Sequence, residues 1–131
     1  MNSLPLLRRP ALGLVFLLAV AACAPATSPS GNLQLIDDAR QSGQPTVVEF
    51  GSDSCASCRQ MKIVMDAVAQ RVQGRGHILV MDVIRDASLQ QPYRIQMIPT
   101  QVFFDAQGRE VWRHMGPLSE AQVMARLGLG Q

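Results

Sequence analysis

The sequence has few of the features that define several common classes of small protein. Its 131 residues include only three cysteines, which are too few for a disulfide-stapled mini-protein. The net charge is only +2, and nothing in it favours binding to nucleic acid. No apolar run reaches the roughly 20 residues that a membrane-spanning helix needs. The length suits one domain, so the function must be sought in local motifs.

Residues 1–22 have the pattern of a removable export signal. Arg8 and Arg9 form its basic start, and an uncharged apolar run of about 12 residues follows. Small residues directly before Cys23 resemble a bacterial lipobox, so we expect cleavage before this residue and lipidation of its thiol. An ordinary secretory signal cut close to Cys23 is the alternative. Loss of the two arginines from 12 basic residues balances the 10 acidic ones, so the mature chain is close to neutral.

The chain beyond the signal divides into a tether and a domain. Residues 23–31 are small, polar and rich in proline, which is typical of a flexible linker that carries the lipidated cysteine. Residues 32–131 have the apolar periodicity of a folded domain. The lipobox resemblance implies that Cys23 carries several acyl chains. More than one chain gives stable anchoring, so we expect the domain to be held at a membrane surface.

Residues 32–131 alternate between helical and strand patterns. Apolar residues in steps of three and four predict helices, and short continuous apolar runs predict buried strands. Two such runs joined by a helix favour a parallel crossover, and the glycine-containing turn 105–108 favours an antiparallel hairpin. The expected order is helix 32–41, strand 46–50, helix 55–73, strand 77–83, short helix 88–93, strand 101–104, strand 110–115 and a last helix from 119 to about 127.

Cys55 and Cys58 are separated by two residues, at the point where strand 46–50 gives way to a long helix. The free N–H groups and positive end of a helix favour a thiolate, the nucleophilic form of cysteine. A zinc site needs four ligands, and the spacing of the remaining His77 and His114 is not that of a zinc finger. A structural disulfide closing so short a loop would add little stability. The pattern favours a redox-active pair, and no metal or other cofactor is expected.

The element order and three landmarks resemble the thioredoxin family. The landmarks are the cysteine pair at a helix start, the step Ile98-Pro99-Thr100 before a strand, and a Phe-Phe-Asp-x-x-Gly hairpin. The resemblance covers residues 32–131 and implies the thioredoxin fold, an α/β fold with a central mixed sheet flanked by helices. Two positions depart from the family pattern: Ser54 replaces a tryptophan, and Ala56-Ser57 replaces the usual Gly-Pro.

The resemblance also implies roles for the site residues. Cys55 matches the exposed nucleophile of the family, and Cys58 matches the buried resolving thiol. Pro99 matches a cis proline beside the sulfurs; a trans proline at a strand start is the alternative that the residues alone leave open. The backbone before this proline is expected to pair with an extended substrate. The expected substrate contacts are Ile98, Pro99, Ala56 and Ser57.

Glu49 falls where the family has a buried aspartate near the resolving cysteine. In strand 46–50, Val47 and Glu49 are expected on one face and Val48 and Phe50 on the other. A buried carboxylate is costly unless it is protonated or partnered, so we expect Glu49 to exchange a proton with the resolving thiol. The alternative is that water or the sheet edge reaches its side chain.

These inferences predict an exported, lipid-anchored thiol–disulfide oxidoreductase facing the periplasm or the outer cell surface. It is expected to act as a monomer on protein disulfides through a mixed disulfide, and to receive electrons from a transmembrane thiol carrier. Two alternatives remain. One is a disulfide oxidase or isomerase of the same fold, and the other is a binding or chaperone module whose cysteine pair is idle.

Overall fold

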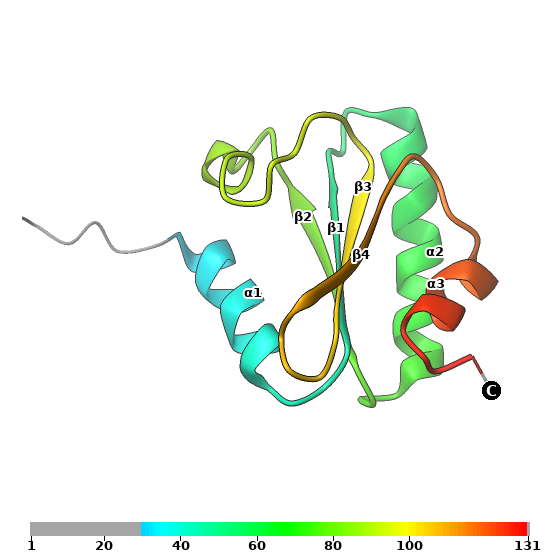
Figure 1. Ribbon diagram of the computed structural model, residues 1–131. Coiled ribbons are helices and arrows are strands. Elements are labelled where there is room, and N and C mark those ends of the chain that lie inside the picture. The colour runs from blue at the N-terminus through cyan, green and yellow to red at the C-terminus, as the bar shows by residue number, and fades with distance from the viewer. Residues whose placement is uncertain (1–29, 131) are drawn as a thin grey trace, which may run out of the picture.

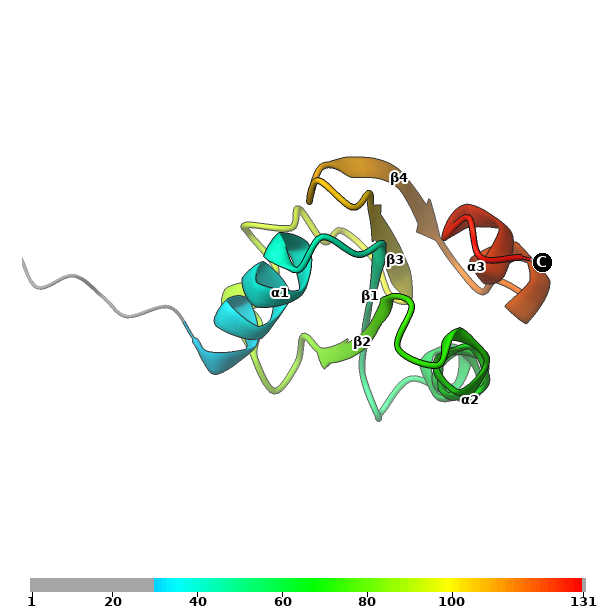
Figure 2. The same ribbon diagram turned by 90° about the horizontal axis from the view of Figure 1, so that it is seen from below.

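The computed structural model describes residues 30–130. A four-stranded sheet separates one helix on its first face from two helices on its second (Figure 1, Figure 2). The predictions for residues 1–22 and for Cys23 lie outside the described residues. The elements are α1 (Gly31–Gln41), β1 (Thr46–Gly51), α2 (Ala56–Val72), β2 (His77–Asp82), the 3₁₀ turn η1 (Ala87–Leu89), β3 (Thr100–Phe104), β4 (Glu110–Met115) and α3 (Glu120–Arg126).

The strand order is β2-β1-β3-β4, which makes β1 and β3 the central strands. The helix α2 connects β1 to the parallel strand β2, and β3 runs antiparallel to both β1 and β4. The hairpin turns at Gly108, whose φ of 73° is the left-handed conformation that glycine adopts most easily. The predicted mixed sheet, with its parallel crossover and antiparallel hairpin, is therefore confirmed.

The two faces of the sheet are covered by different apolar clusters. Figure 2 shows α1 on one side, with α2 and α3 together on the other. Val48 and Phe50 pack into the cluster on the α1 side, whereas Val47 packs against α2 and α3. The expected alternation along β1 is confirmed, and it places Glu49 on the α2 side.

Three element boundaries differ from the sequence-based expectation. The first helix begins at Gly31, one residue earlier than expected, and its cap is the Ser30 hydroxyl, which accepts from the backbone N–H of Leu33. The second helix begins at Ala56, with Cys55 as its cap. The expected short helix 88–93 is reduced to the single turn η1, because Pro92 lacks an N–H and disfavours a helical conformation in the residue before it.

The last helix has the capping box that the sequence predicts. The Ser119 hydroxyl accepts from the backbone N–H of Gln122, and the Gln122 side chain accepts from the backbone N–H of Ser119. Among residues 30–130, no helix has both the length and the apolar character needed to cross a membrane. The candidate site lies at the carboxyl end of β1, where the loop to α2 begins and where the segment before β3 ends.

Candidate active site

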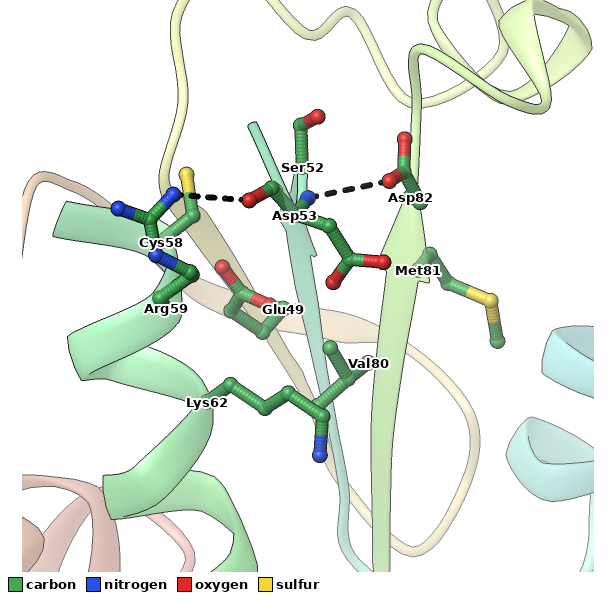
Figure 3. Close-up of a pocket in the computed structure, with 10 residues that line it drawn as sticks. Glu49, Ser52, Asp53, Cys58, Arg59, Lys62, Val80, Met81 and Asp82 are labelled. Atoms are coloured by element: carbon green, nitrogen blue, oxygen red, sulfur yellow. Dashed lines mark hydrogen bonds between the residues drawn. The ribbon is translucent and has the colours of Figure 1, made fainter. Parts of the chain in front are cut away.

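The loop between β1 and α2 holds both cysteines at the start of the helix. The backbone N–H of Cys55 donates to the carbonyl of Ser52 at 3.1 Å, which closes a turn directly before the helix. Within this turn, the Asp53 N–H donates to the carboxylate of Asp82, and the Asp53 carbonyl accepts from the Arg59 side chain (Figure 3). The cysteine loop is thereby fastened to both β2 and α2.

The Cys55 thiol occupies the cap position of α2 and is partly exposed. Its sulfur lies 3.2 Å from the Ser57 hydroxyl oxygen. Hydrogen bonds from Ser57 and then from Cys58 favour the thiolate and lower the pKa of Cys55 to about 7. A large fraction of Cys55 is therefore thiolate near neutral pH.

Cys58 lies one turn further along the helix, and its pKa is shifted in the opposite direction. The residue is only 3% exposed. Burial, and then the hydrogen bond to the neighbouring Cys55, raise the pKa of Cys58 to about 12. Cys58 is therefore a neutral thiol that must lose its proton to a neighbouring group before it can act as a nucleophile.

Glu49 lies beneath this thiol, between α2 and β2 (Figure 3). It is 1% exposed, and its Oε1 has no hydrogen-bond partner among the described residues. Burial and then the negative charge of Cys55 raise the pKa of Glu49 to about 7, against an opposing effect of Lys62. Glu49 is therefore buried, and because β1 is a central strand, the sheet edge does not expose its side chain.

Gly51 gives the carboxyl group of Glu49 its space. A Cβ at this position would overlap Glu49 Oε1 and lie 3.1 Å from the Cβ of Cys58. A cavity of about 20 Å³ adjoins the three residues, which is close to the volume of one water molecule. Its remaining lining comes from the cysteine loop, α2 and β2: Ser52, Asp53, Arg59, Lys62, Val80, Met81 and Asp82.

The peptide bond between Ile98 and Pro99 is cis, as the resemblance implied. Because Phe50 of β1 pairs with Thr100 of β3, this step lies at the same end of the sheet as the cysteine loop. Pro99 is buried and Ile98 is half-buried. Between the cysteines, Ala56 is exposed and Ser57 half-buried, so part of the expected substrate contact is accessible.

Three site features were not predicted from the sequence. Ser57 was expected to contact substrate, but its bond to the Cys55 sulfur was not anticipated. Lys62 follows Cys58 by four residues, so helical spacing could have placed it beside the pair. Gln101 is fully buried near the start of β3, directly opposite Glu49, and a polar residue directly before the apolar run Val-Phe-Phe was the available signal. The roles of the predicted site residues stay predictions.

The described residues offer no evident metal centre. Within residues 30–130, no group of three or more His, Cys, Asp and Glu side chains is placed to hold a metal ion. The chemistry available to this arrangement is that of two unlike thiols and one buried acid.

Comparisons with known proteins agree with this geometry. A thioredoxin-like domain model matches residues 34–130. A thioredoxin of Rickettsia conorii is 27% identical over 64 residues, which are 49% of this chain and 61% of that protein. A thioredoxin of Synechocystis sp. is 25% identical over 102 residues, which are 78% of this chain and 94% of that protein.

The fold has solved counterparts. The crystal structure of chloroplastic thioredoxin z superimposes with a TM-score of 0.65 and 29% sequence identity, covering 76% of this chain and 88% of that one. The family match spans both the cysteine helix and the proline–hairpin segment. The sequence landmarks, the mixed sheet and these matches together show that the chain belongs to the thioredoxin-like family.

Proposed function

We propose that the chain is an exported thiol–disulfide oxidoreductase that reduces disulfides in protein substrates. The family, and the thioredoxins to which the chain is similar, support the reaction class. The observation that carries the proposal is that Cys55 is partly exposed at the start of α2 whereas Cys58, one helical turn further, is buried; in keeping with this contrast, the pKa of Cys55 is lowered and that of Cys58 is raised. In such a pair, one cysteine is a thiolate that can attack a disulfide, and the other stays a neutral thiol until the second step.

In the first step, the Cys55 thiolate attacks one sulfur of a substrate disulfide. A bond forms between Cys55 and that sulfur, the substrate disulfide breaks, and the other substrate sulfur leaves as a thiolate. The backbone at Ile98, at the same end of the sheet as the cysteine loop, is proposed to hold the substrate in an extended conformation.

In the second step, Cys58 resolves the mixed disulfide. Its proton passes to the Glu49 carboxylate, and the resulting thiolate attacks the Cys55 sulfur. The bond between Cys55 and substrate breaks, and the second substrate thiolate leaves. The two electrons that reduce the substrate come from the cysteine pair, which ends as a Cys55–Cys58 disulfide.

The oxidised pair must be reduced again before another cycle. An exported protein works in a compartment kept oxidising, so we propose that a transmembrane thiol carrier supplies the electrons. The lipobox pattern at Cys23 supports attachment to a membrane, facing the periplasm or the outer cell surface. Tethering near the carrier would keep donor and acceptor close together.

Reduction of insulin, together with the redox potential of the pair, tests this proposal. The wild-type chain is expected to reduce insulin, Cys55→Ser to be inactive, and Cys58→Ser to accumulate the mixed disulfide. Equilibration with thiol buffers is expected to give a potential near the thioredoxin value of about −270 mV. A value near about −120 mV would indicate an oxidase instead. A folded chain without a titratable pair would be a binding or chaperone module.

A further inference from the structure

Gln101 is a polar residue in the interior of the fold. It has 0% exposure and is the second residue of β3. Among the described residues, neither its Oε1 nor its Nε2 has a hydrogen-bond partner, and the same is true of Glu49 Oε1. A buried polar group without a partner destabilises a fold, so the presence of two such groups calls for an explanation.

The sheet places these two unpartnered groups side by side. Glu49 and Gln101 are direct partners in the antiparallel register of β1 and β3. Val47 and Phe103, which lie two residues from them along the same strands, both belong to the apolar cluster on the α2 side, so both polar side chains share that face. Directly opposite residues have Cβ atoms about 4.5–5.5 Å apart, a separation that a hydrogen bond between an amide and a carboxyl group can span.

A glutamine suits both protonation states of this acid. Its amide oxygen accepts a hydrogen bond from a protonated carboxyl group, and its NH₂ donates to a carboxylate. An apolar residue here could do neither, and a second acid or a base would add charge. We propose that Gln101 is a positioning residue that hydrogen-bonds the Glu49 carboxyl group in both protonation states and holds it toward Cys58 during proton transfer.

This inference rests on the proposed function, because the proton transfer belongs to resolution of the mixed disulfide. Gln101 exchanges no proton itself: the proton leaves the Cys58 sulfur and arrives at a Glu49 oxygen, and the amide stabilises both end states. The bond to the carboxylate is charge-assisted and therefore stronger than the bond to the neutral acid. Gln101 thus lowers the pKa of Glu49 relative to an apolar residue at the same place.

Other charges also bear on this acid, and the test must separate them from the amide. Lys62 forms an ion pair with Asp66 at 2.9 Å, which limits its effect. On the far side of Gln101, His114 is its partner on β4. The titratable or charged groups that face Glu49 from the elements around it are Cys55, Cys58 and Lys62 of α2, Asp82 of β2 and, beyond Gln101, His114 of β4.

The helix α3 also packs on this face, but its charges are engaged elsewhere. Glu120 pairs with Arg71 at 2.8 Å, and the Arg126 guanidinium lies 4.1 Å from the centre of the Trp112 ring. None of the charged groups named changes in a Gln101→Met variant. A shift in the titration of Glu49 can therefore be assigned to the loss of the amide.

The composition of the chain makes this titration easy to observe. The sequence contains three glutamates, so ¹³C labelling of glutamate carboxyl groups gives three signals, and Glu49→Gln identifies one of them. In the reduced full-length chain, Gln101→Met is expected to raise the pKa of Glu49 by about one unit, because the carboxylate loses its donor. Phe103→Leu, on the same strand and face, removes no hydrogen bond and is expected to leave the signal unchanged.

The rate of the second step provides a readout of function. In the mixed disulfide Cys55 carries no negative charge, so burial is the main cause that keeps the pKa of Glu49 raised. Loss of the amide is expected to raise this pKa further, so release of substrate at a pH below it is expected to slow up to about tenfold in Gln101→Met for a rise of one unit, with its pH midpoint shifted upward equally. An unchanged midpoint in this variant would overturn the inference.

A measurement on the unmodified chain guards against a variant that fails to fold. The side-chain NH₂ signals of Gln101 are expected to shift with pH, with the same midpoint as the Glu49 carboxyl signal. Signals that do not move through this range would also overturn the inference. Because both titrations are read directly from the two side chains, failure to reduce insulin would count against the proposed function alone.

Discussion

The two faces of the sheet bury similar amounts of apolar side chain but treat polar groups differently. On the α1 side, the hydroxyls of Thr46 and Thr100 donate to backbone carbonyls, at 3.3 and 2.7 Å. On the α2 side, Glu49 and Gln101 are equally buried, and each has an atom without a partner among the described residues. The polar groups on the first face are hydroxyls that backbone carbonyls satisfy, whereas the second face holds the Glu49 carboxyl group and the Cys58 thiol. The two acidic groups proposed to exchange a proton therefore lie on the same side of the sheet.

The largest expected effect comes from disrupting the apolar cluster on the α1 side of the sheet. Phe50 is fully buried on the α1 side, with its ring centre 4.9 Å from that of Tyr93. Phe50→Ala is expected to lower the free energy of unfolding by about 3–5 kcal/mol, measured by urea denaturation. The pH midpoint for alkylation of Cys55 is expected to stay near 7 in the folded variant. A large shift of this midpoint would mean that the two faces are not independent.

Glu49 makes the stability of the reduced protein depend on pH. Its pKa is about 7 in the folded chain and about 4.5 in the unfolded chain, so only the folded state holds the proton between these values. The resulting stabilisation is complete below pH 4.5 and is lost as the pH rises through 7. The loss amounts to about 3 kcal/mol and is expected to be absent in Glu49→Gln, as measured by denaturation at several pH values.

A second glutamate provides the control for that experiment. Arg113 lowers the pKa of Glu110, so the stabilisation from Glu110 is present at neutral pH and is lost as the pH falls. Glu110→Gln should therefore leave the loss between pH 4.5 and 7 in place. If Glu49→Gln retained the full loss, another buried group would have to account for it.

Substitution of Gly51 tests whether the Glu49 carboxyl group, on the α2 side of the sheet, needs the space that this glycine leaves free. Gly51→Ala would place a Cβ against Glu49 Oε1 and 3.1 Å from the Cβ of Cys58. The overlap is expected to cost about 1–3 kcal/mol of stability and to displace the carboxyl group, which changes the pH dependence of the second step. Gly31→Ala is the matched control, because a Cβ there meets nothing within 4 Å. Equal effects of the two substitutions would contradict this account of Gly51.

The smallest expected effect comes from Ser57, in the partly exposed first turn of α2. Ser57→Ala removes the hydroxyl 3.2 Å from the Cys55 sulfur and is expected to raise the pKa of Cys55 above 7 by about half a unit, since water partly replaces the lost bond. The rate of iodoacetamide alkylation against pH measures this shift. Ser54→Ala is the control, because the Ser54 hydroxyl bonds to Ser52 and not to the sulfur.

The sequence predicted the features that depend on local pattern. Apolar periodicity located the strands and the long helix, and alternation along β1 placed Glu49 correctly on the face opposite Phe50. The family resemblance supplied the cis bond before Pro99. The pairing of Glu49 with Gln101 could not be predicted in the same way, because it depends on the register of strands that are about 50 residues apart. The bond from Ser57 to Cys55 likewise depends on one side-chain rotamer.

The space at Gly51 also has a consequence for evolution within the family. Glutamate is one methylene longer than aspartate, and here the additional length is accommodated because position 51 has no side chain. Positions 49 and 51 should therefore co-vary among related chains. Homologues with glutamate at the position of Glu49 are expected to have glycine two residues later, whereas those with aspartate can carry a side chain there. An alignment in which glutamate at position 49 occurs together with large side chains at position 51 would contradict this account of how the longer side chain is accommodated.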